Sequence, residues 1–161
     1  MNTRIIATIG PSSFDEEIIK SLVAEGVSVL RINLKYAGRK ELLELKRMME
    51  EVDCELLIDV LDTRSAEQVS DLECDYVALS FTETTQQIKD LKKVMNPDAK
   101  VISKIETVKG VNNITNLIKA SDGLMIARGD LGEHVPLEQL PFFQKEIIKE
   151  CNESERFVIT A

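Results

Sequence analysis

The stretch VISKIETVKGV, residues 101–111, places a lysine and a glutamate two positions apart inside an apolar run. Its β-branched residues indicate a buried strand, and alternate side chains of a strand point to the same face. Lys104 and Glu106 are therefore expected to lie side by side on one face. Opposite charges at such a place form either a buried structural pair or part of a reactive site.

Six other apolar runs have the same character as this one: RIIATIG, VSVLRINL, CELLIDV, DYVALSF, GLMIARG and RFVITA. Most of the segments between them have the charge and apolar spacing of amphipathic helices, whereas residues 63–72 give only a short and weak signal. Strand and helix alternate at intervals of about twenty residues. This rhythm predicts repeated strand–helix–strand units and a parallel sheet.

Two α/β architectures satisfy that rhythm, a doubly wound open sheet and a (βα) barrel. Polar residues at the strand ends favour the barrel. A full barrel has eight strands and about 250 residues, whereas this chain has seven runs and 161 residues. We therefore predict an incomplete TIM-type (βα) barrel with seven strands, formed by one domain over residues 1–161. Either an eighth strand is missing from this sequence, or another chain supplies the closure, in which case the protein forms a homo-oligomer.

Three details of the helices are expected. Ser13 is the candidate N-cap of the first helix, and Pro141 should break or restart the last one. The helix after the second strand is expected to have an apolar face made of Leu42, Leu43, Met48 and Met49.

Composition excludes several classes of partner. The 20 basic and 28 acidic residues give a net charge of −8, which argues against nucleic acid or an anionic membrane but allows a small anionic substrate. Three cysteines without a CxxC spacing indicate reduced thiols and a cytoplasmic protein. The single histidine, His134, gives no usual zinc spacing with them. No run has the length expected of a signal peptide or a membrane span.

Polar residues gather at the end of the second strand. Arg31, Asn33 and Lys35 alternate with apolar residues, so all three are expected on one face, the barrel interior. Two cations at a barrel mouth need negatively charged partners, from the protein or from a ligand. The alternative is an exposed edge strand with a solvated face.

The other strand ends contribute further candidates. Ser12 lies in a turn before a helix, which suits an anion, although a plain turn and cap would look the same. Asp59 ends the third strand and Asp62 follows closely, so either acid could face the site. Ser80 ends the fourth strand with no basic partner in view, and is not a nucleophile candidate.

The fifth and sixth strands should be neighbours, about 4.8 Å apart. Glu106 and Asp130 could therefore share one hard cation, and Mg²⁺ suits two carboxylates completed by water and substrate oxygens. Lys104 beside that ion could stabilise or protonate an enolate. The turn expected around Gly129 and Asp130, which follows Arg128, offers backbone N–H groups for a carboxylate. A buried Lys–Glu pair beside a glycine turn is the alternative.

These residues in this order resemble the pyruvate kinase family. The resemblance runs from TRIIATIGPSS to FVITA, and its most specific parts are VISKIE, ASDGLMIARGDLG and VPLEQLPFFQKEIIKECN. It implies the glycolytic transfer of a phosphoryl group from phosphoenolpyruvate to ADP, giving pyruvate and ATP. It also implies Mg²⁺, or Mn²⁺ in its place, and potassium as cofactors.

By position, the resemblance implies a role for each matching residue. Lys104 is implied to act near the phosphoryl group and the enolate, Arg31 to contact phosphate, and Glu106 and Asp130 to bind the divalent metal. The substrate carboxylate is implied to bind at Ala127, Arg128, Gly129 and Asp130, with Ser12 as a further anion contact. Asn33, Lys35 and Asp59 form the monovalent-cation region.

The chain departs from the family pattern at three places. Lys35 and Tyr36 replace a Ser-His pair, and we hypothesise that the Lys35 ammonium takes the place of potassium. The motif after the third strand is eroded: strand lengths favour Asp59 for its aspartate, while matching letters favour Asp62. Only a short segment stands where the family inserts a lid domain, and an eighth strand and a C-terminal domain are not expected.

Two other functions fit the same residues. One is a Mg²⁺-dependent lyase or aldolase of the wider phosphoenolpyruvate/pyruvate barrel group that uses no nucleotide, and the short connection in place of a lid favours it. The other is a non-enzymatic oxyacid or metal sensor, against which the intact Lys104, Glu106 and Asp130 argue.

Overall fold

The computed structural model describes residues 3–161, so Met1 and Asn2 of the predicted domain range lie outside the described residues. These residues form one sheet of seven parallel strands that pair in chain order. The strands are β1 (Ile5–Thr8), β2 (Val27–Asn33), β3 (Glu55–Val60), β4 (Tyr76–Leu79), β5 (Lys100–Ile105), β6 (Gly123–Ile126) and β7 (Phe157–Thr160). Because the order never skips or reverses, each strand–helix unit adds to the same edge, as in a barrel.

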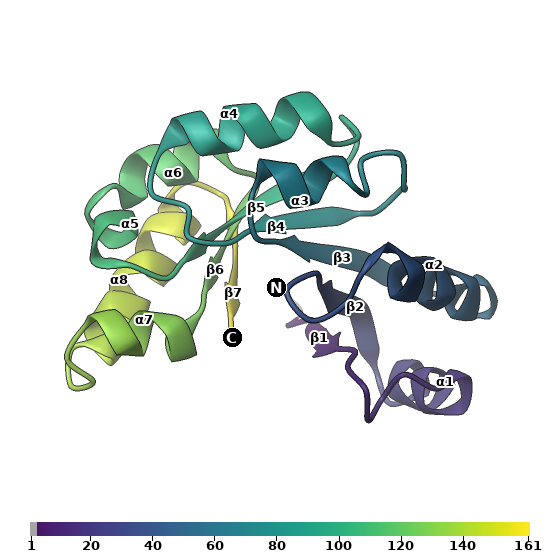
Figure 1. Ribbon diagram of the computed structural model, residues 1–161. Helices are drawn as coiled ribbons and strands as arrows, with labels where there is room; N and C mark the ends of the chain where they lie inside the picture. Colours follow the sequence, from purple (N-terminus) through teal and green to yellow (C-terminus); the bar gives the residue numbers. More distant parts are fainter. Residues whose placement is uncertain (1–2) are drawn as a thin grey trace.

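Helices follow the strands along the outside of the curled sheet (Figure 1). They are α1 (Glu16–Ala24), α2 (Arg39–Met48), the 3₁₀ helix η1 (Met49–Glu51), α3 (Thr63–Glu67), α4 (Thr85–Val94), α5 (Val108–Asn112), α6 (Ile114–Ala120), α7 (Arg128–His134) and α8 (Leu140–Glu153). Within residues 3–161, none of these helices has the length and apolar character needed to cross a membrane.

Each face of the sheet has its own core. The larger core lies between the sheet and the helices, where strand residues such as Ile58 and Leu124 pack with helix residues such as Ile19 and Leu91. The smaller core fills the inside of the curl and contains Val29, Leu57, Tyr76, Ala78, Ile102 and Met125. A filled interior is typical of a barrel rather than of an open sheet. The predicted seven-stranded incomplete barrel is therefore confirmed, with β1 and β7 at its edges.

Two expectations about helices were wrong. The N-cap of α1 is Asp15, whose Oδ1 accepts hydrogen bonds from the backbone N–H groups of Glu17 (3.0 Å) and Ile18 (3.1 Å). Ser13 instead closes the preceding turn by accepting from the backbone of Gly10. On the helix after β2, Leu42 is buried and Met48 and Met49 pack against the larger core as expected, but Leu43 is 46% exposed and Leu45 is buried in its place. Residues 42 and 45 share a helix face because they are three positions apart, while residue 43 lies about 100° around the helix from residue 42.

Two other parts of the chain are now defined. The weak segment after the third strand forms α3, which buries Ala66 and leads to the buried Val69. It connects β3 to β4 without any inserted domain. Pro141 lies in the first turn of α8, so it restarts the helix as predicted, because that turn needs no N–H from it.

Candidate active site

Four charged side chains lie together at the carboxyl ends of β2, β3 and β5. Lys104 Nζ is 3.0 Å from Glu106 Oε1 and 3.2 Å from Asp59 Oδ2. The side chains of Lys104, Glu106 and Asp59 are 5%, 2% and 0% exposed. Arg31 binds the same Asp59 oxygen through Nη2 (2.6 Å) and Nε (3.0 Å). The pair predicted from alternation is therefore part of a buried network that crosses three strands.

Strand alternation explains why these charges meet. On β5, Ile102 belongs to the inner core and Lys104 and Glu106 follow it at two-residue steps. On β3, Leu57 belongs to the inner core and Asp59 is the next inward residue. The interior of the sheet is thus apolar near its middle and charged at the carboxyl end, where barrel sites are found.

Glu106 is held from two sides. Its Oε1 faces Lys104, and its Oε2 accepts the backbone N–H of Phe81 at 2.5 Å. Burial raises the pKa of Glu106, and the negative charge of Asp130 adds to the rise, while the Phe81 N–H and Lys104 oppose it. A cation held near both carboxylates would oppose this rise in the pKa of Glu106.

The candidate donors for a divalent ion are the two carboxylates of Glu106 and Asp130. Within residues 3–161, no group of three or more His, Cys, Asp or Glu side chains is arranged to hold a metal. Glu106 and Asp130 would supply two carboxylates, and Mg²⁺ is commonly bound by one or two carboxylates with the remaining positions taken by water and substrate oxygens.

The segment after β6 differs from the turn predicted there. Residues 128–134 form α7, so Asp130 lies in the first turn of a helix. Ala127 is buried before this helix, whereas Arg128 and Gly129 are exposed at its start. The Arg128 backbone N–H and Nε each donate to the Ala161 carbonyl at 3.1 Å. This segment is therefore joined to the end of β7.

Lys35 lies outside the strand in which it was expected. Strand β2 ends at Asn33, whose Oδ1 accepts the backbone N–H of Lys35 at 2.9 Å, so the chain turns there. The Lys35 side chain is exposed, with Nζ 5.4 Å from the centre of the Tyr36 ring. Contact with Tyr36 raises the pKa of Lys35, and the charges of Asp130 and Glu106 contribute. The prediction that the alternation continues to Lys35 was therefore wrong.

The remaining predicted residues, Asp59, Asp62 and Ser12, have different surroundings. Asp59 is in the buried network, whereas Asp62 caps α3 by accepting the backbone N–H of Ser65 at 2.7 Å. Ser12 is exposed in the turn after β1.

Two residues of the network were missed. Ser80 Oγ lies 2.9 Å from Lys104 Nζ and 3.3 Å from Asp59 Oδ1. Thr8 Oγ1 accepts from Arg31 Nη1 at 3.0 Å. Alternation could have found Ser80, because it follows the inward Ala78 by two positions, but it was considered only as a nucleophile. The structure makes Ser80 an acceptor for a lysine instead.

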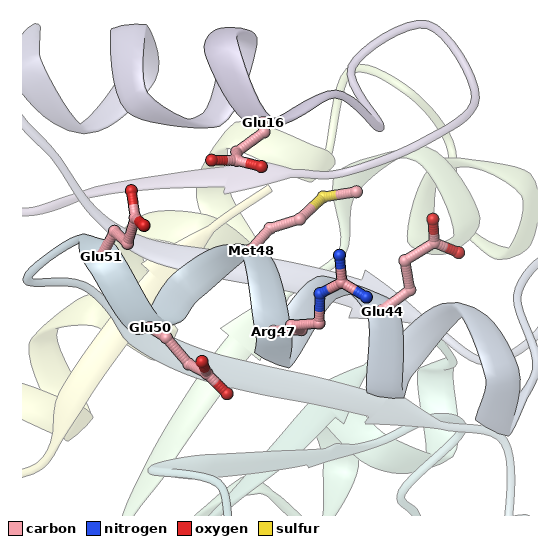
Figure 2. A pocket seen from close by; sticks show the side chains of 6 residues that line it. All are labelled: Glu16, Glu44, Arg47, Met48, Glu50 and Glu51. Carbon is pink, nitrogen blue, oxygen red and sulfur yellow. The ribbon is translucent and has the colours of Figure 1, made fainter.

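A depression of about 230 Å³ lies elsewhere, between α1 and the α2–η1 segment (Figure 2). It is lined by Glu16, Glu44, Arg47, Met48, Glu50 and Glu51. None of the predicted site residues lines this depression, so it is separate from the charged network at the strand ends.

Known proteins resemble this chain along its whole length. The family model described as "Pyruvate kinase, barrel domain" matches residues 61–161. Chloroplastic pyruvate kinase isozyme A of Nicotiana tabacum is 35% identical over 164 positions, which cover 98% of this chain and 26% of that protein. Pyruvate kinase of Clostridium perfringens is 43% identical over 95 positions, covering 56% of this chain and 20% of its own.

Pyruvate kinase of Thermoplasma acidophilum aligns with all of this chain, at 26% identity, and with 48% of its own length. That alignment has 259 positions against the 161 residues here, so the relative contains residues without a counterpart. The chain spans about a fifth to a half of the length of these three relatives. Its match to the barrel model begins directly after β3, where α3 forms the short connection. The chain therefore belongs to the pyruvate kinase family, and residues 61–161 correspond to the barrel domain of that family.

Proposed function

We propose that this chain transfers a phosphoryl group from phosphoenolpyruvate to ADP, giving pyruvate and ATP. Family membership supports this reaction, and one feature of this chain's own structure supports it further. The Lys104 ammonium is buried at the strand ends between the carboxylates of Asp59 and Glu106. A fixed cation beside paired carboxylates suits a substrate that is itself anionic and gains charge on an enolate oxygen.

Two cations would act on the substrate directly. Arg31, fixed by Asp59 and Thr8, would contact the phosphate. Lys104 would stabilise the enolate oxygen as its bond to phosphorus breaks and a bond from phosphorus to an ADP oxygen forms. The enolate then takes up a proton at its terminal carbon to become pyruvate. Positioning and charge neutralisation supply most of the rate in such transfers.

Glu106 and Asp130 would hold Mg²⁺, or Mn²⁺ in its place. Such an ion supplies positive charge to the substrate oxygens and orients them. The substrate carboxylate would bind at Ala127–Asp130, and Ser12 would contact the phosphate from the turn after β1. In the monovalent-cation region, Lys35 would replace potassium beside Asn33 and Asp59.

A second function is favoured by the connection between β3 and β4. Helix α3 occupies this connection, so no lid follows β3 to exclude water and clamp a nucleotide. A Mg²⁺-dependent lyase, aldolase or oxyacid-binding protein would need Lys104, Glu106 and Asp130 but no such lid.

A lactate-dehydrogenase-coupled assay with phosphoenolpyruvate, ADP and Mg²⁺ tests the first function. We expect Mg²⁺-dependent turnover that falls at least about a hundredfold in Glu106→Gln, because a metal ligand contributes several kcal/mol to transition-state stabilisation. Glu133→Gln is the matched control, since Glu133 is exposed on the same helix as Asp130. Turnover that survives in Glu106→Gln would contradict the metal assignment.

Calorimetry with oxalate and Mg²⁺ separates the second function from the first. If the chain is inactive in the coupled assay but binds oxalate only with Mg²⁺, and Glu106→Gln abolishes that binding, the nucleotide-free function is supported. Oxalate binding that is equally strong without Mg²⁺ would contradict both.

A further inference from the structure

The end of β4 contacts both members of the central charge pair. Ser80 Oγ accepts a hydrogen bond from Lys104 Nζ at 2.9 Å. The next residue, Phe81, donates its backbone N–H to Glu106 Oε2 at 2.5 Å. Two consecutive residues of one strand end therefore each hold one charged group of the neighbouring strand.

The backbone at this corner is unusual. Phe81 has a φ of 47°, in the left-handed region that bulky residues rarely adopt. Its side chain is 39% exposed, so packing of the ring does not explain the conformation. Such a conformation persists only where the surroundings determine it. Here Gln87 Nε2 donates to the Phe81 carbonyl at 3.1 Å, and Thr82 Oγ1 donates to the Leu79 carbonyl at 2.7 Å.

The partners of Lys104 show what Ser80 contributes. An ammonium group has three N–H donors, and Lys104 directs them to oxygens of Asp59, Ser80 and Glu106. Ser80 also donates to Asp59 Oδ1 at 3.3 Å, so its hydroxyl connects the lysine to that carboxylate. If a metal ion took up the Glu106 oxygen that faces Lys104, Ser80 and Asp59 would remain as partners of the ammonium.

We propose that the Ser80–Phe81 corner is a positioning element that fixes Lys104 and Glu106 separately, so that each can serve its own task. Phe81 N–H fixes one oxygen of Glu106, and Ser80 together with Asp59 would keep the Lys104 ammonium in place when Glu106 is engaged by a metal ion. The proposal rests on the proposed function in so far as Lys104 acts on a substrate.

Kinetics of Ser80→Ala provide the first test. We expect kcat to fall about tenfold to a hundredfold with little change in KM, because a hydrogen bond to a charged group is lost. Ser80→Thr keeps the hydroxyl and should restore most of kcat. The matched control is Ser103→Ala, which removes a hydroxyl buried on the other face of β5, 2.6 Å from Ser121 Oγ. A wild-type kcat in Ser80→Ala would overturn the proposal.

Nuclear magnetic resonance of the ¹⁵N-labelled lysine ammonium groups, recorded without substrate, provides a second test. We expect a Lys104 signal protected from exchange in the wild type and in Ser103→Ala, with and without Mg²⁺. In Ser80→Ala it should shift, and it should be lost when Mg²⁺ is added. An unprotected wild-type signal, or an unchanged one in Ser80→Ala, would contradict the proposal. If no form of the chain turns over substrate, the proposed function fails while this measurement still decides the role of Ser80.

Discussion

At the scale of single residues, the site consists of buried charged side chains that are paired with opposite charges. Lys104 and Asp59 are buried almost completely, and each has an oppositely charged partner on another strand. Removing one member of a buried pair typically costs about 3–5 kcal/mol, because an uncompensated charge remains. Such a network is a costly way to stabilise a fold, which supports a chemical role for it.

Lys35 allows a test at the same scale. Its exposed ammonium carries a positive charge, and the carboxylates of Asp130 and Glu106 contribute to raising its pKa. We expect turnover that is the same with and without potassium at equal ionic strength. Lys35→Ser should make the rate depend on potassium, because the fixed charge is gone.

Lys40→Ser is the control for this measurement, since Lys40 is exposed on the neighbouring helix α2. It should leave the rate independent of potassium. A strict potassium requirement in the wild-type chain would contradict the replacement of potassium by Lys35.

At the scale of elements, two aspartates near the connection from β3 to β4 have different structural roles. Asp59 is the last inward-facing residue of β3, whereas Asp62 caps α3 by accepting the backbone N–H of Ser65. The two residues are only three positions apart. The letters of the eroded motif therefore could not distinguish a site residue from a helix cap.

Substitution separates these tasks. Asp62→Ala should lower the free energy of unfolding by about 1 kcal/mol, the usual effect of losing an N-cap, and leave Mg²⁺-dependent oxalate binding unchanged. Asp59→Asn should weaken that binding, because Lys104 and Arg31 lose their shared carboxylate. Urea unfolding and calorimetry measure the two effects. Weaker oxalate binding in Asp62→Ala would reverse the assignment.

At the scale of the whole molecule, the curled sheet has a packed interior that is open toward its edges. Leu57, on a middle strand, is fully buried in the inner core, whereas Ile6 on β1 and Ile159 on β7 are only partly buried against it. The stabilisation from inner packing should therefore decrease from the middle strands to the edge strands.

This gradient can be measured. Leu57→Ala should lower the free energy of unfolding by about 2–5 kcal/mol, because it leaves a cavity among fully buried neighbours. Ile6→Ala should cost about 1 kcal/mol, since that side chain is only partly buried against the inner core. Urea unfolding of both variants checks the difference. Equal and small losses would show that the inside of the sheet is not a packed core.

Much of this organisation could be read from the sequence, because it depends on local periods. Two-residue alternation predicted that Lys104 and Glu106 share a face, and the strand–helix rhythm predicted the parallel incomplete barrel. Local signals failed where competing residues were close in sequence. Ser13 and Asp15 were both suitable caps, and Leu43 and Leu45 were both apolar residues of one helix.

The sequence by itself therefore determined the class of fold and the faces of its strands, because both follow from the spacing of residues along one element. Only the tertiary structure decided which groups meet. The contacts of Lys104 with Asp59 and Ser80 join residues 45 and 24 positions apart, and they depend on the curl of the sheet and on the bend at Phe81. The position of Lys35, where the chain turns out of β2, was also decided by the tertiary structure, because the end of a strand depends on its neighbours.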